Sequence, residues 1–307
     1  MVFQNGLIFQ KTIEGLTLMD NIIINLYVLV DDFIKKLKKM PHFEVPRLGK
    51  VRCGRKRNLS LSEIVTLGIF RFYFDFTSWK HYHKVLMVSY KDYFPELTNY
   101  ENFMKYLNVS FGLVVLIVNV LLKQQKGTHD IQFIDSTSLP VCDNKRINTH
   151  KVCTGAAERG HSSKGWYYGF KLHAVCDLDG DLLSILITPG NTDDRKYLDK
   201  ILDGLNGLVV GDAGYLSKDL VRHFLEKDIL LLTGVRKNMN KLMSKPQHDL
   251  LKCRQIIESV FSILKTRMNM ATNLARSITG LFRHYMYCIL AYMLNIRNNQ
   301  KLMIENQ

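Results

Sequence analysis

Two aspartates stand where short apolar runs end, and both runs are typical of β-strands. Asp135 ends the run QFID, and Asp212 ends the run LVVGD. Ligands commonly bind at the carboxyl ends of strands in α/β sheets. An aspartate at such a point can also form a turn, so each residue by itself leaves both interpretations open. The two become more informative when a third acid is considered with them.

The third acid is Glu258, which stands in a strongly basic part of the sequence. The segment from Gly234 to Met303 holds twelve Lys and Arg residues but only two Asp and Glu residues. Glu258 follows Arg254 by four residues and precedes Lys265 by seven. On one continuous helix these three side chains would lie within about 40° of one face. We expect such a helix over 250–268, largely buried, and a structural Arg–Glu pair is the alternative interpretation of its polar face.

Three carboxylates brought together in this way would hold two divalent metal ions. Cleavage of a phosphodiester through two ions about 4 Å apart requires several carboxylates that converge on them. Mg²⁺ prefers oxygen ligands and keeps part of its water shell. A central strand would supply a bridging Asp, a neighbouring strand the second Asp, and a helix on the sheet the Glu. This arrangement predicts a ribonuclease-H-like fold, with Asp135, Asp212 and Glu258 as catalytic residues and metal ligands.

The segment RQIIESVFSILK resembles the signature of bacterial insertion-sequence DDE transposases. That signature is Tyr, two residues, Arg, three residues, Glu, six residues and Lys, and Arg254, Glu258 and Lys265 match it in type and spacing. Leu251 stands in place of the Tyr, a departure that concerns that aromatic ring and not the metal site. FIDSTSLP, GWYYGFKLH, TPGNTDDR and GDAGY resemble further blocks of the family. Over residues 130–295 the set of blocks is most similar to the insertion sequence 982 group.

The resemblance implies a transposase that cleaves DNA at the ends of an insertion sequence and transfers the cleaved strand into target DNA. It implies two Mg²⁺ ions, with Mn²⁺ as an alternative, held by the three acids. It also implies double-stranded DNA as the partner, both terminal repeats and target, and a homo-oligomer assembled on that DNA. Arg254 and Lys265 would bind this DNA or support the site.

The sequence divides near residue 128 into a helical part and an α/β part. Before that point apolar residues recur at helical spacing, and Ser60 and Glu63 form the pattern of a capping box. We expect residues 1–128 to form an all-helical DNA-binding or accessory domain. Beyond it, helices are interspersed with five strand-like runs, at 131–135, 166–177, 182–188, 208–212 and 229–233. This pattern predicts an α/β domain over 129–307 with a mixed sheet, flanking helices and basic C-terminal helices.

Basic residues outside the acidic set are candidates for contacts with DNA. Lys171 and His173 alternate on an expected strand and therefore share a face. They would touch phosphate or assist proton transfer, and a structural role is the alternative. Arg55, Lys56 and Arg57 lie in a basic connector, which is either a phosphate-contacting arm or a solvated loop.

The segment 145–164 is basic and contains Gly and Ser, which favours a mobile loop that orders on DNA. Trp166 and Tyr167 follow it, and their rings would either stack on an unpaired base or pack in the core. Asp193 and Asp194 are best explained as residues at the start of a helix, which we expect over 191–205, where the helix dipole favours negative charge.

The composition fits a folded protein with a polyanionic partner. The chain holds 42 Lys and Arg against 28 Asp and Glu, a net charge of +14, which suits phosphate binding. A hydrophobic content of 47 % excludes a disordered chain. The six cysteines form no C-x-x-C pair, which argues against a zinc ribbon or a disulfide scaffold. No secretory signal and no sufficiently long apolar run are visible, and we interpret the longest apolar stretch, 111–122, as part of a buried helix. We therefore expect a cytoplasmic, nucleoid-associated protein without a membrane partner.

Two alternatives remain open at the level of sequence. The first is a metal-dependent DNA nuclease on the same fold that performs no strand transfer, because the metal chemistry of the two enzymes is shared. The second is a catalytically inactive DNA-binding protein whose helical N-terminal part does the binding. Joining of a DNA 3′-hydroxyl separates the first alternative from a transposase, and DNA binding without any cleavage would favour the second.

Overall fold

The computed structural model describes residues 18–39, 59–74, 76–127, 129–163, 165–215, 217–234, 244–271 and 274–304. The chain divides into two compact units, Met1–Val114 and Val115–Gln307. The boundary between the units falls inside a long helix, whereas the sequence predicted a domain boundary after residue 128. The roles predicted for the two parts stay predictions.

The regular structure described in the first unit is helical. It comprises α1 (Leu18–Lys38), α2 (Leu61–Phe70), a short 3₁₀ turn η1 (Arg71–Tyr73), α3 (Trp79–Ser89) and the first half of α4 (Tyr100–Gln125). The predicted capping box is confirmed: the hydroxyl of Ser60 accepts from the backbone N–H of Glu63, whose carboxylate accepts from the Ser60 N–H. Such a box satisfies two N–H groups that a helix start leaves unpaired.

Helix α4 was predicted as a buried helix. Residues Tyr100–Gln125 are long and apolar enough, by length and composition alone, to cross a membrane, and 44 % of the most apolar stretch is buried within the protein. Its buried side chains include Phe103, Leu107, Val114 and Val118. The core helix of a globular protein meets the same criterion of length and composition.

The second unit is built on one mixed sheet of six strands. The strands are β1 (Ile131–Cys142), β2 (Glu158–Ser162), β3 (Gly165–Cys176), β4 (Leu182–Pro189), β5 (Gly207–Gly211) and β6 (Ile229–Thr233). The order is β2-β3-β1-β5-β6, and β4 also pairs with β3. Strand β1 pairs antiparallel with β3 and parallel with β5, and β6 runs parallel to β5. β1 therefore lies between an antiparallel and a parallel part of the sheet.

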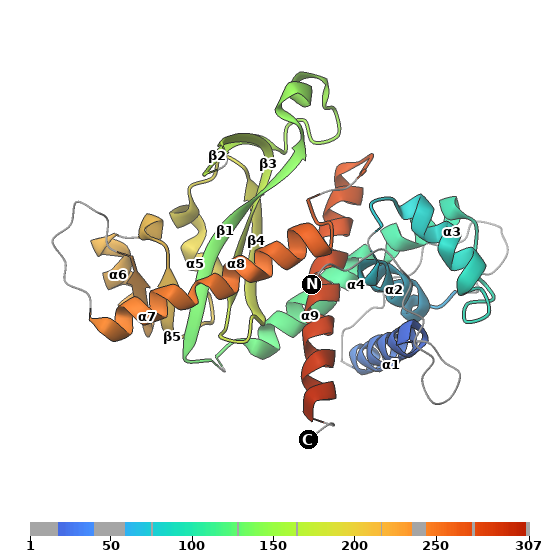
Figure 1. Ribbon diagram of the computed structural model, residues 1–307, viewed down its shortest axis with the longest axis horizontal. Coiled ribbons are helices and arrows are strands. Elements are labelled where there is room, and N and C mark those ends of the chain that lie inside the picture. The colour runs from blue at the N-terminus through green and yellow to red at the C-terminus, as the bar shows by residue number, and fades with distance from the viewer. Residues whose placement is uncertain are drawn as a thin grey trace. The chain divides into compact units, whose positions relative to one another are not determined.

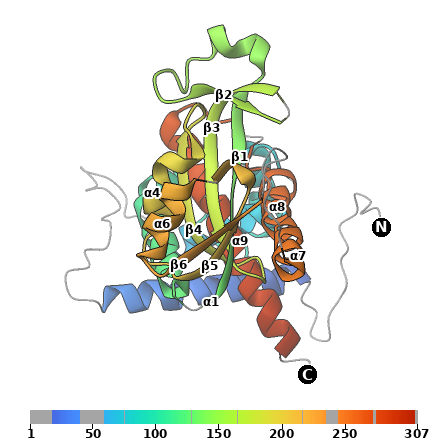
Figure 2. The same ribbon diagram turned by 90° about the vertical axis from the view of Figure 1, so that its left-hand side faces the viewer.

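Helices cover both faces of this sheet (Figures 1 and 2). The elements are η2 (Asn144–Thr149), η3 (Asp194–Tyr197), α5 (Leu198–Ile201), η4 (Ala213–Tyr215), α6 (Lys218–Leu225), α7 (Lys245–Cys253), α8 (Gln255–Ser262), the π-helical turn η5 (Ile263–Arg267) and α9 (Ile278–Ile304). Figure 2 shows α6 on one side of the sheet and α7 and α8 on the other. The predicted mixed sheet flanked by helices is thus confirmed.

Two apolar layers hold these helices to the sheet. On the side of α5 and α6 the buried cluster includes Ile134, Val209, Leu198, Ile201 and Phe224. On the opposite side α8 contributes Ile257 and Val260, and the hydroxyl of Tyr292 on α9 donates to the carbonyl of Gly180 in the β3–β4 turn, 2.9 Å away. Each fully buried Leu or Ile contributes about 1.5–3 kcal/mol, so both layers fix the sheet relative to its helices.

Four sequence predictions of local structure were wrong. The strand expected to end at Asp135 continues to Cys142 as β1. Residues 145–164 contain a 3₁₀ turn and the strand β2 instead of forming only a loop. The helix expected over 191–205 is reduced to η3 and α5. The helix expected over 250–268 is interrupted: α7 ends at Cys253, α8 begins at Gln255, and Arg254 lies at the junction.

Candidate active site

A cavity of about 680 Å³ lies against the second unit's sheet, where the predicted acidic residues meet. It is bounded by β1, the β2–β3 hairpin, η3, the residue that follows β5, and α8 with η5. Its lining comprises Asp135, Ser136, Thr137, Ser138, His161, Ser162, Ser163, Tyr167, Lys171, Asp194, Asp212, Arg254, Glu258, Phe261, Ser262, Lys265 and Thr266. Six of the ten predicted site residues are among them: Asp135, Asp212, Glu258, Arg254, Lys265 and Lys171.

Asp135 lies within β1, and its side chain is 21 % exposed. The backbone N–H of Ser136 donates to its Oδ1 at 2.7 Å. Burial raises the pKa of Asp135 above its usual value, and the nearby Asp212 adds to this, whereas the Ser136 N–H and Arg254 act in the opposite direction. A carboxylate in such surroundings is stabilised as an anion by nearby hydrogen-bond donors and cations, here the Ser136 N–H and Arg254.

Asp212 follows β5 directly, and β5 pairs with β1, the strand that carries Asp135. Because Phe133 pairs with Val210 in parallel register, Asp135 and Asp212 stand at equivalent positions two residues further along their strands. The Asp212 side chain is 59 % exposed, and its Oδ1 accepts from the N–H of Ala213 at 2.6 Å. The strand pairing therefore places this carboxylate beside that of Asp135, at the open side of the cavity.

Glu258 is supplied by α8, which packs on β1 and β3. The apolar side chains of Ile257, Val260 and Phe261 face the sheet and are buried, whereas that of Glu258 is 60 % exposed. The helix thus anchors by its apolar face and presents this carboxylate at the rim of the cavity.

Arg254 links the three carboxylates. Its guanidinium nitrogens lie 3.3 Å from Oδ2 of Asp135, 3.5 Å from Oδ1 of Asp212 and 3.6 Å from Oε1 of Glu258. The Asp135 and Glu258 distances share one nitrogen, so these two oxygens lie no more than about 7 Å apart, a span that two ions about 4 Å apart can bridge. A single permanent cation thus neutralises part of the charge of all three acids.

The three acids do not converge closely enough in this arrangement to coordinate an ion together. Within the described ranges, no group of three His, Cys, Asp or Glu side chains has the geometry to hold a metal ion. The donor set itself, three carboxylates on one cavity, has the oxygen chemistry that Mg²⁺ prefers. Arg254 lies between these groups, so it would have to move aside before they could coordinate ions jointly.

The remaining predicted residues differ in where they lie. Lys265, in the π-helical turn η5, donates from Nζ to the hydroxyl of Thr137 at 3.1 Å, within the cavity lining. His173 is wholly buried and does not line the cavity. Arg55, Lys56 and Arg57 lie outside the described residues.

Lys171 lies on the cavity and is paired with an acid that the sequence analysis assigned to a helix start. Its ammonium group donates to Oδ1 of Asp194 at 3.0 Å and to the carbonyl of Thr192 at 2.8 Å. Asp193 does cap the turn η3, where it accepts from the N–H of Arg195, whereas Asp194 lines the cavity. Only the sheet pairing, which no local pattern reveals, brings Asp194 to Lys171.

His173 is buried beside Asp194, the acid that pairs with Lys171. Its Nε2 lies 2.9 Å from the Thr188 hydroxyl, and its Nδ1 lies 3.6 Å from Asp194. Burial lowers the pKa of His173 from 6.5 to about 4, and Lys171 adds to this, while Asp194 opposes it. The side chain is therefore neutral in the folded protein at neutral pH, which favours the structural role over proton transfer.

The lowered pKa of His173 makes stability depend on pH. Below pH 6.5 the unfolded chain binds a proton at this residue, whereas the folded chain does so only near pH 4. Stability is therefore full above pH 6.5 and is lost as the pH falls towards 4, by up to about 3 kcal/mol. Melting temperatures of wild type and His173→Gln across this range should converge at low pH. Parallel curves would show that His173 does not contribute.

The wall of the cavity formed by β2 requires glycine at one close approach. A Cβ atom on Gly160 would lie 2.2 Å from the carbonyl oxygen of Gly190 and 2.7 Å from the ring of Tyr167. The Tyr167 hydroxyl donates to the same carbonyl at 3.0 Å. The close approach at Gly160 and the Tyr167 hydrogen bond thereby hold β2, β3 and the turn after β4 together at the wall of the cavity.

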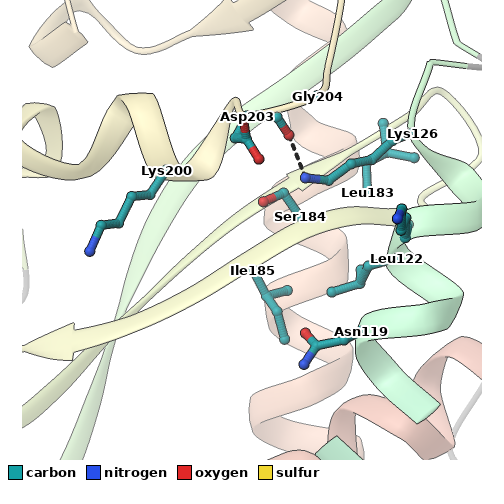
Figure 3. A pocket seen from close by; sticks show the side chains of 10 residues that line it. Asn119, Leu122, Lys126, Leu183, Ser184, Ile185, Lys200, Asp203 and Gly204 are labelled. Atoms are coloured by element: carbon teal, nitrogen blue, oxygen red, sulfur yellow. Dashed lines mark hydrogen bonds between the residues drawn. The ribbon is translucent and has the colours of Figure 1, made fainter. Parts of the chain in front are cut away.

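A second cavity, of about 490 Å³, lies between α4, β4 and the turn after α5 (Figure 3). Lys123, Lys126 and Lys200 line it, with Asp203 as the only acidic lining residue. Figure 3 shows the ammonium group of Lys126 directed at the carbonyl of Asp203, to which it donates. Three lysines against one aspartate give this cavity a net positive charge, which suits a phosphate oxygen better than a metal ion.

Comparison with known proteins places the chain in a family. Residues 125–278 match the model of the transposase DDE domain, which is half of the chain. A protein named as a transposase for insertion sequence element IS6501 of Brucella ovis is 34 % identical over 114 residues, which span 36 % of this chain and 86 % of that protein. The chain therefore belongs to the DDE transposase family.

Two further similarities are more distant. The transposase for insertion sequence element IS1106 of Neisseria meningitidis serogroup B is 28 % identical over 109 residues, 34 % of this chain and only 38 % of that protein. The solved structure of the piggyBac transposase synaptic complex with hairpin DNA shares 11 % identity, with a TM-score of 0.49, over 91 % of this chain and 73 % of the other. The family assignment rests on the domain match and on the Brucella relative.

Membership of the family establishes the activity. The protein is a transposase, an enzyme that binds DNA, cleaves it at insertion-sequence ends and transfers the strand. Transposase DDE domains generally use divalent metal ions. The predictions of a transposase and of a polynucleotidyl transferase are thus confirmed, and the alternatives of a nuclease and of an inactive DNA-binding protein are disfavoured.

Proposed function

We propose that Asp135, Asp212 and Glu258 are the catalytic acids of this transposase and that they hold two Mg²⁺ ions, or Mn²⁺ as an alternative. The observation that supports this is the guanidinium of Arg254, within 3.3–3.6 Å of all three carboxylates. A cavity that gathers three acids around one cation also attracts divalent cations. When bound, such ions activate the attacking oxygen and stabilise the leaving oxygen of a phosphodiester.

The chain's own residues divide the remaining work. Asp135 is the most buried of the acids, and its raised pKa gives it the largest gain from a nearby cation. When ions bind, the Arg254 side chain would move away from the three carboxylates. Its planar guanidinium would then bind a DNA phosphate through two hydrogen bonds. Lys265 and Lys171 line the same cavity and would contact the strand on either side of the acids. Position and charge stabilisation are what the protein adds to the metal chemistry.

The finer fold assignment belongs to the same proposal. The acids come from a central strand, from the parallel strand beside it and from a helix packed on the sheet, which supports a ribonuclease-H-like domain. The first unit would bind DNA, together with the connector that contains Arg55, Lys56 and Arg57.

Four further properties are proposed from the sequence alone. The chain would belong to the insertion sequence 982 group and act on the terminal repeats of its element and on target DNA. It would assemble as a homo-oligomer on that DNA, in the cytoplasm and associated with the nucleoid.

The proposal is tested by assaying purified protein with DNA that contains the element's flanking ends. Cleavage should require Mg²⁺ or Mn²⁺, and the released 3′-hydroxyl should be joined to a second DNA. Glu258→Gln should remove both activities while circular dichroism shows an unchanged fold. Wild-type cleavage by Glu258→Gln would mean that Glu258 only pairs with Arg254 and that the third metal ligand lies elsewhere.

Lys265→Ala should mainly weaken the engagement of the DNA end. Lys265 lies seven residues beyond Glu258, inside the π-helical turn η5, so it reaches DNA more easily than the ions. We expect the cleavage rate to fall at subsaturating DNA and to recover at saturating DNA. A defect that persists at saturating DNA would place Lys265 in the chemical step instead.

A further inference from the structure

Trp166 is unusual among the aromatic residues of the second unit because it faces solvent. The residue is 67 % exposed, whereas its neighbour Tyr167 is only 6 % exposed and lies behind the acids. The structure therefore separates the two rings that sequence analysis treated alike: Tyr167 packs in the core, and Trp166 does not. A single exposed apolar side chain is common on protein surfaces, so a role for Trp166 has to be argued from its neighbours.

The indole packs against a side chain that lines the catalytic cavity. His161 stands opposite Trp166 in the β2–β3 pairing, and the two rings pack edge to face with centroids 5.1 Å apart and planes at 72°. His161 itself lines the cavity that contains the three acids. Asn144 donates to the backbone carbonyl of Trp166 at 2.7 Å, and the hydroxyl of Tyr167 is bonded to Gly190. The backbone under the ring is thus fixed from both sides.

The segment that leads into this ring is basic and exposed. Lys145, Arg146, Lys151 and Arg159 lie in the segment between β1 and β3, and all four are exposed. The same segment, which Figure 1 shows extending beyond the end of the sheet, has only Asp143 and Glu158 as acids among its described residues. Exposed lysines and arginines beside an aromatic face are the combination that binds single-stranded nucleic acid, because cations contact the backbone while the ring stacks on a base.

We propose that Trp166, supported by His161, is a stacking site for one unpaired base of the DNA strand that enters the catalytic cavity. The site takes an unpaired base and not a duplex, because paired bases stack on each other and leave no free face for an indole. This inference rests on the proposed function, since it requires DNA to reach the three acids. It adds a base-binding site to a centre that otherwise contacts only phosphates and metal ions.

The test compares three DNAs of equal length and strand number: a blunt duplex, a duplex with a short single-stranded overhang, and the same overhang without bases. The abasic overhang keeps every phosphate charge and removes only the surfaces that stack. Wild type should bind the overhang with bases at least about 5-fold more tightly than the abasic one. A 2-aminopurine placed in the overhang should lose fluorescence on binding, since stacking quenches it. Both measurements are made without metal, so they do not depend on catalysis.

Variants locate the effect. Trp166→Ala should abolish the preference for the overhang with bases and the quenching, yet bind blunt duplex like wild type. Trp166→Phe should retain part of the preference, because a smaller ring still stacks. Leu178→Ala is the matched control. Leu178 is 50 % exposed just beyond the opposite end of β3, so this substitution removes exposed apolar surface away from the cavity. It should leave every affinity unchanged.

The outcomes separate this inference from the proposed function. Equal affinity of wild type for overhangs with and without bases, or a preference that survives in Trp166→Ala, overturns the stacking site. Loss of cleavage in Glu258→Gln would still support the acids in that case. Stacking lost in Trp166→Ala together with normal cleavage by Glu258→Gln would support the base site and refute the acidic one.

Discussion

Asp212→Asn is expected to abolish DNA cleavage and strand transfer while DNA binding stays intact or becomes tighter. The substitution keeps the shape of the side chain but removes the charge that would hold the metal ions. Metal ions supply several kcal/mol of transition-state stabilisation, and each 1.36 kcal/mol is a factor of ten. Rates of cleavage and of 3′-hydroxyl joining should therefore fall by about 10³-fold or more. Affinity, measured by anisotropy, should not fall, because a negative charge near phosphate has been removed.

The chain offers a close control for this change. Asp199 on α5 has the same side-chain exposure as Asp212, 59 %, and its carboxylate is paired with His223 and Lys227. Exposed pairs of this kind contribute about 0–1 kcal/mol to stability. Asp199→Asn should therefore leave cleavage, strand transfer and binding unchanged. Wild-type rates in Asp212→Asn, or an equal loss in Asp199→Asn, would remove Asp212 from the catalytic set.

Strands with a strong local pattern were predictable from the sequence. β6, with the apolar run ILLLT, begins and ends where it was expected, and β4 and β5 do so within one residue. β2 has the sequence ERGHS, in which apolar and polar residues do not alternate, so nothing local indicated a strand. Its pairing with β3 comes from tertiary contacts, which regularly override weak local preference for strands.

β1 illustrates the same limit at a functional residue. The sequence predicted that the strand ends at Asp135, whereas it continues to Cys142 through the polar residues STS. Those residues pair with β3 from Ser136 to Cys142. Asp135 therefore lies inside a paired strand and is more buried than a strand-end residue would be. The chemical type of the residue was predictable, but its burial and raised pKa were not.

The helix of Glu258 was the least accurate part of the sequence analysis. The expected common face of Arg254, Glu258 and Lys265 assumed one regular helix, whereas the helix is interrupted at Arg254 and widens into a π-turn before Lys265. All three residues nevertheless line the cavity. Interruptions of this type are frequent at functional sites, and they depend on packing against the sheet, which residue spacing does not encode.

The position of Arg254 has a consequence for metal binding. Its guanidinium now neutralises the acids that are proposed to bind the ions, so arginine and metal compete for the same carboxylates. Removing the guanidinium should make it easier for ions to enter. It should also leave three unbalanced acids in the metal-free protein, of which Asp135 is the most buried. The stability of the protein should then depend more strongly on divalent ions than it does in the wild type.

Arg254→Ala should accordingly show opposite changes in metal affinity and in rate. Without metal its melting temperature should fall, and Mn²⁺ or Mg²⁺ should raise it further and at lower concentration than in wild type, because binding to the folded state alone stabilises it. Cleavage should nevertheless drop about 10- to 100-fold, because the guanidinium that holds the DNA strand is lost.

Two further variants separate charge from geometry. Arg254→Lys should keep the charge and the fold, yet its cleavage rate should remain low. Arg222→Lys, the same change at an exposed arginine of α6, should match wild type throughout. Unchanged metal dependence in Arg254→Ala would show that arginine and ions do not share these acids, and a rate restored in Arg254→Lys would show that charge alone, without the planar fork, is sufficient.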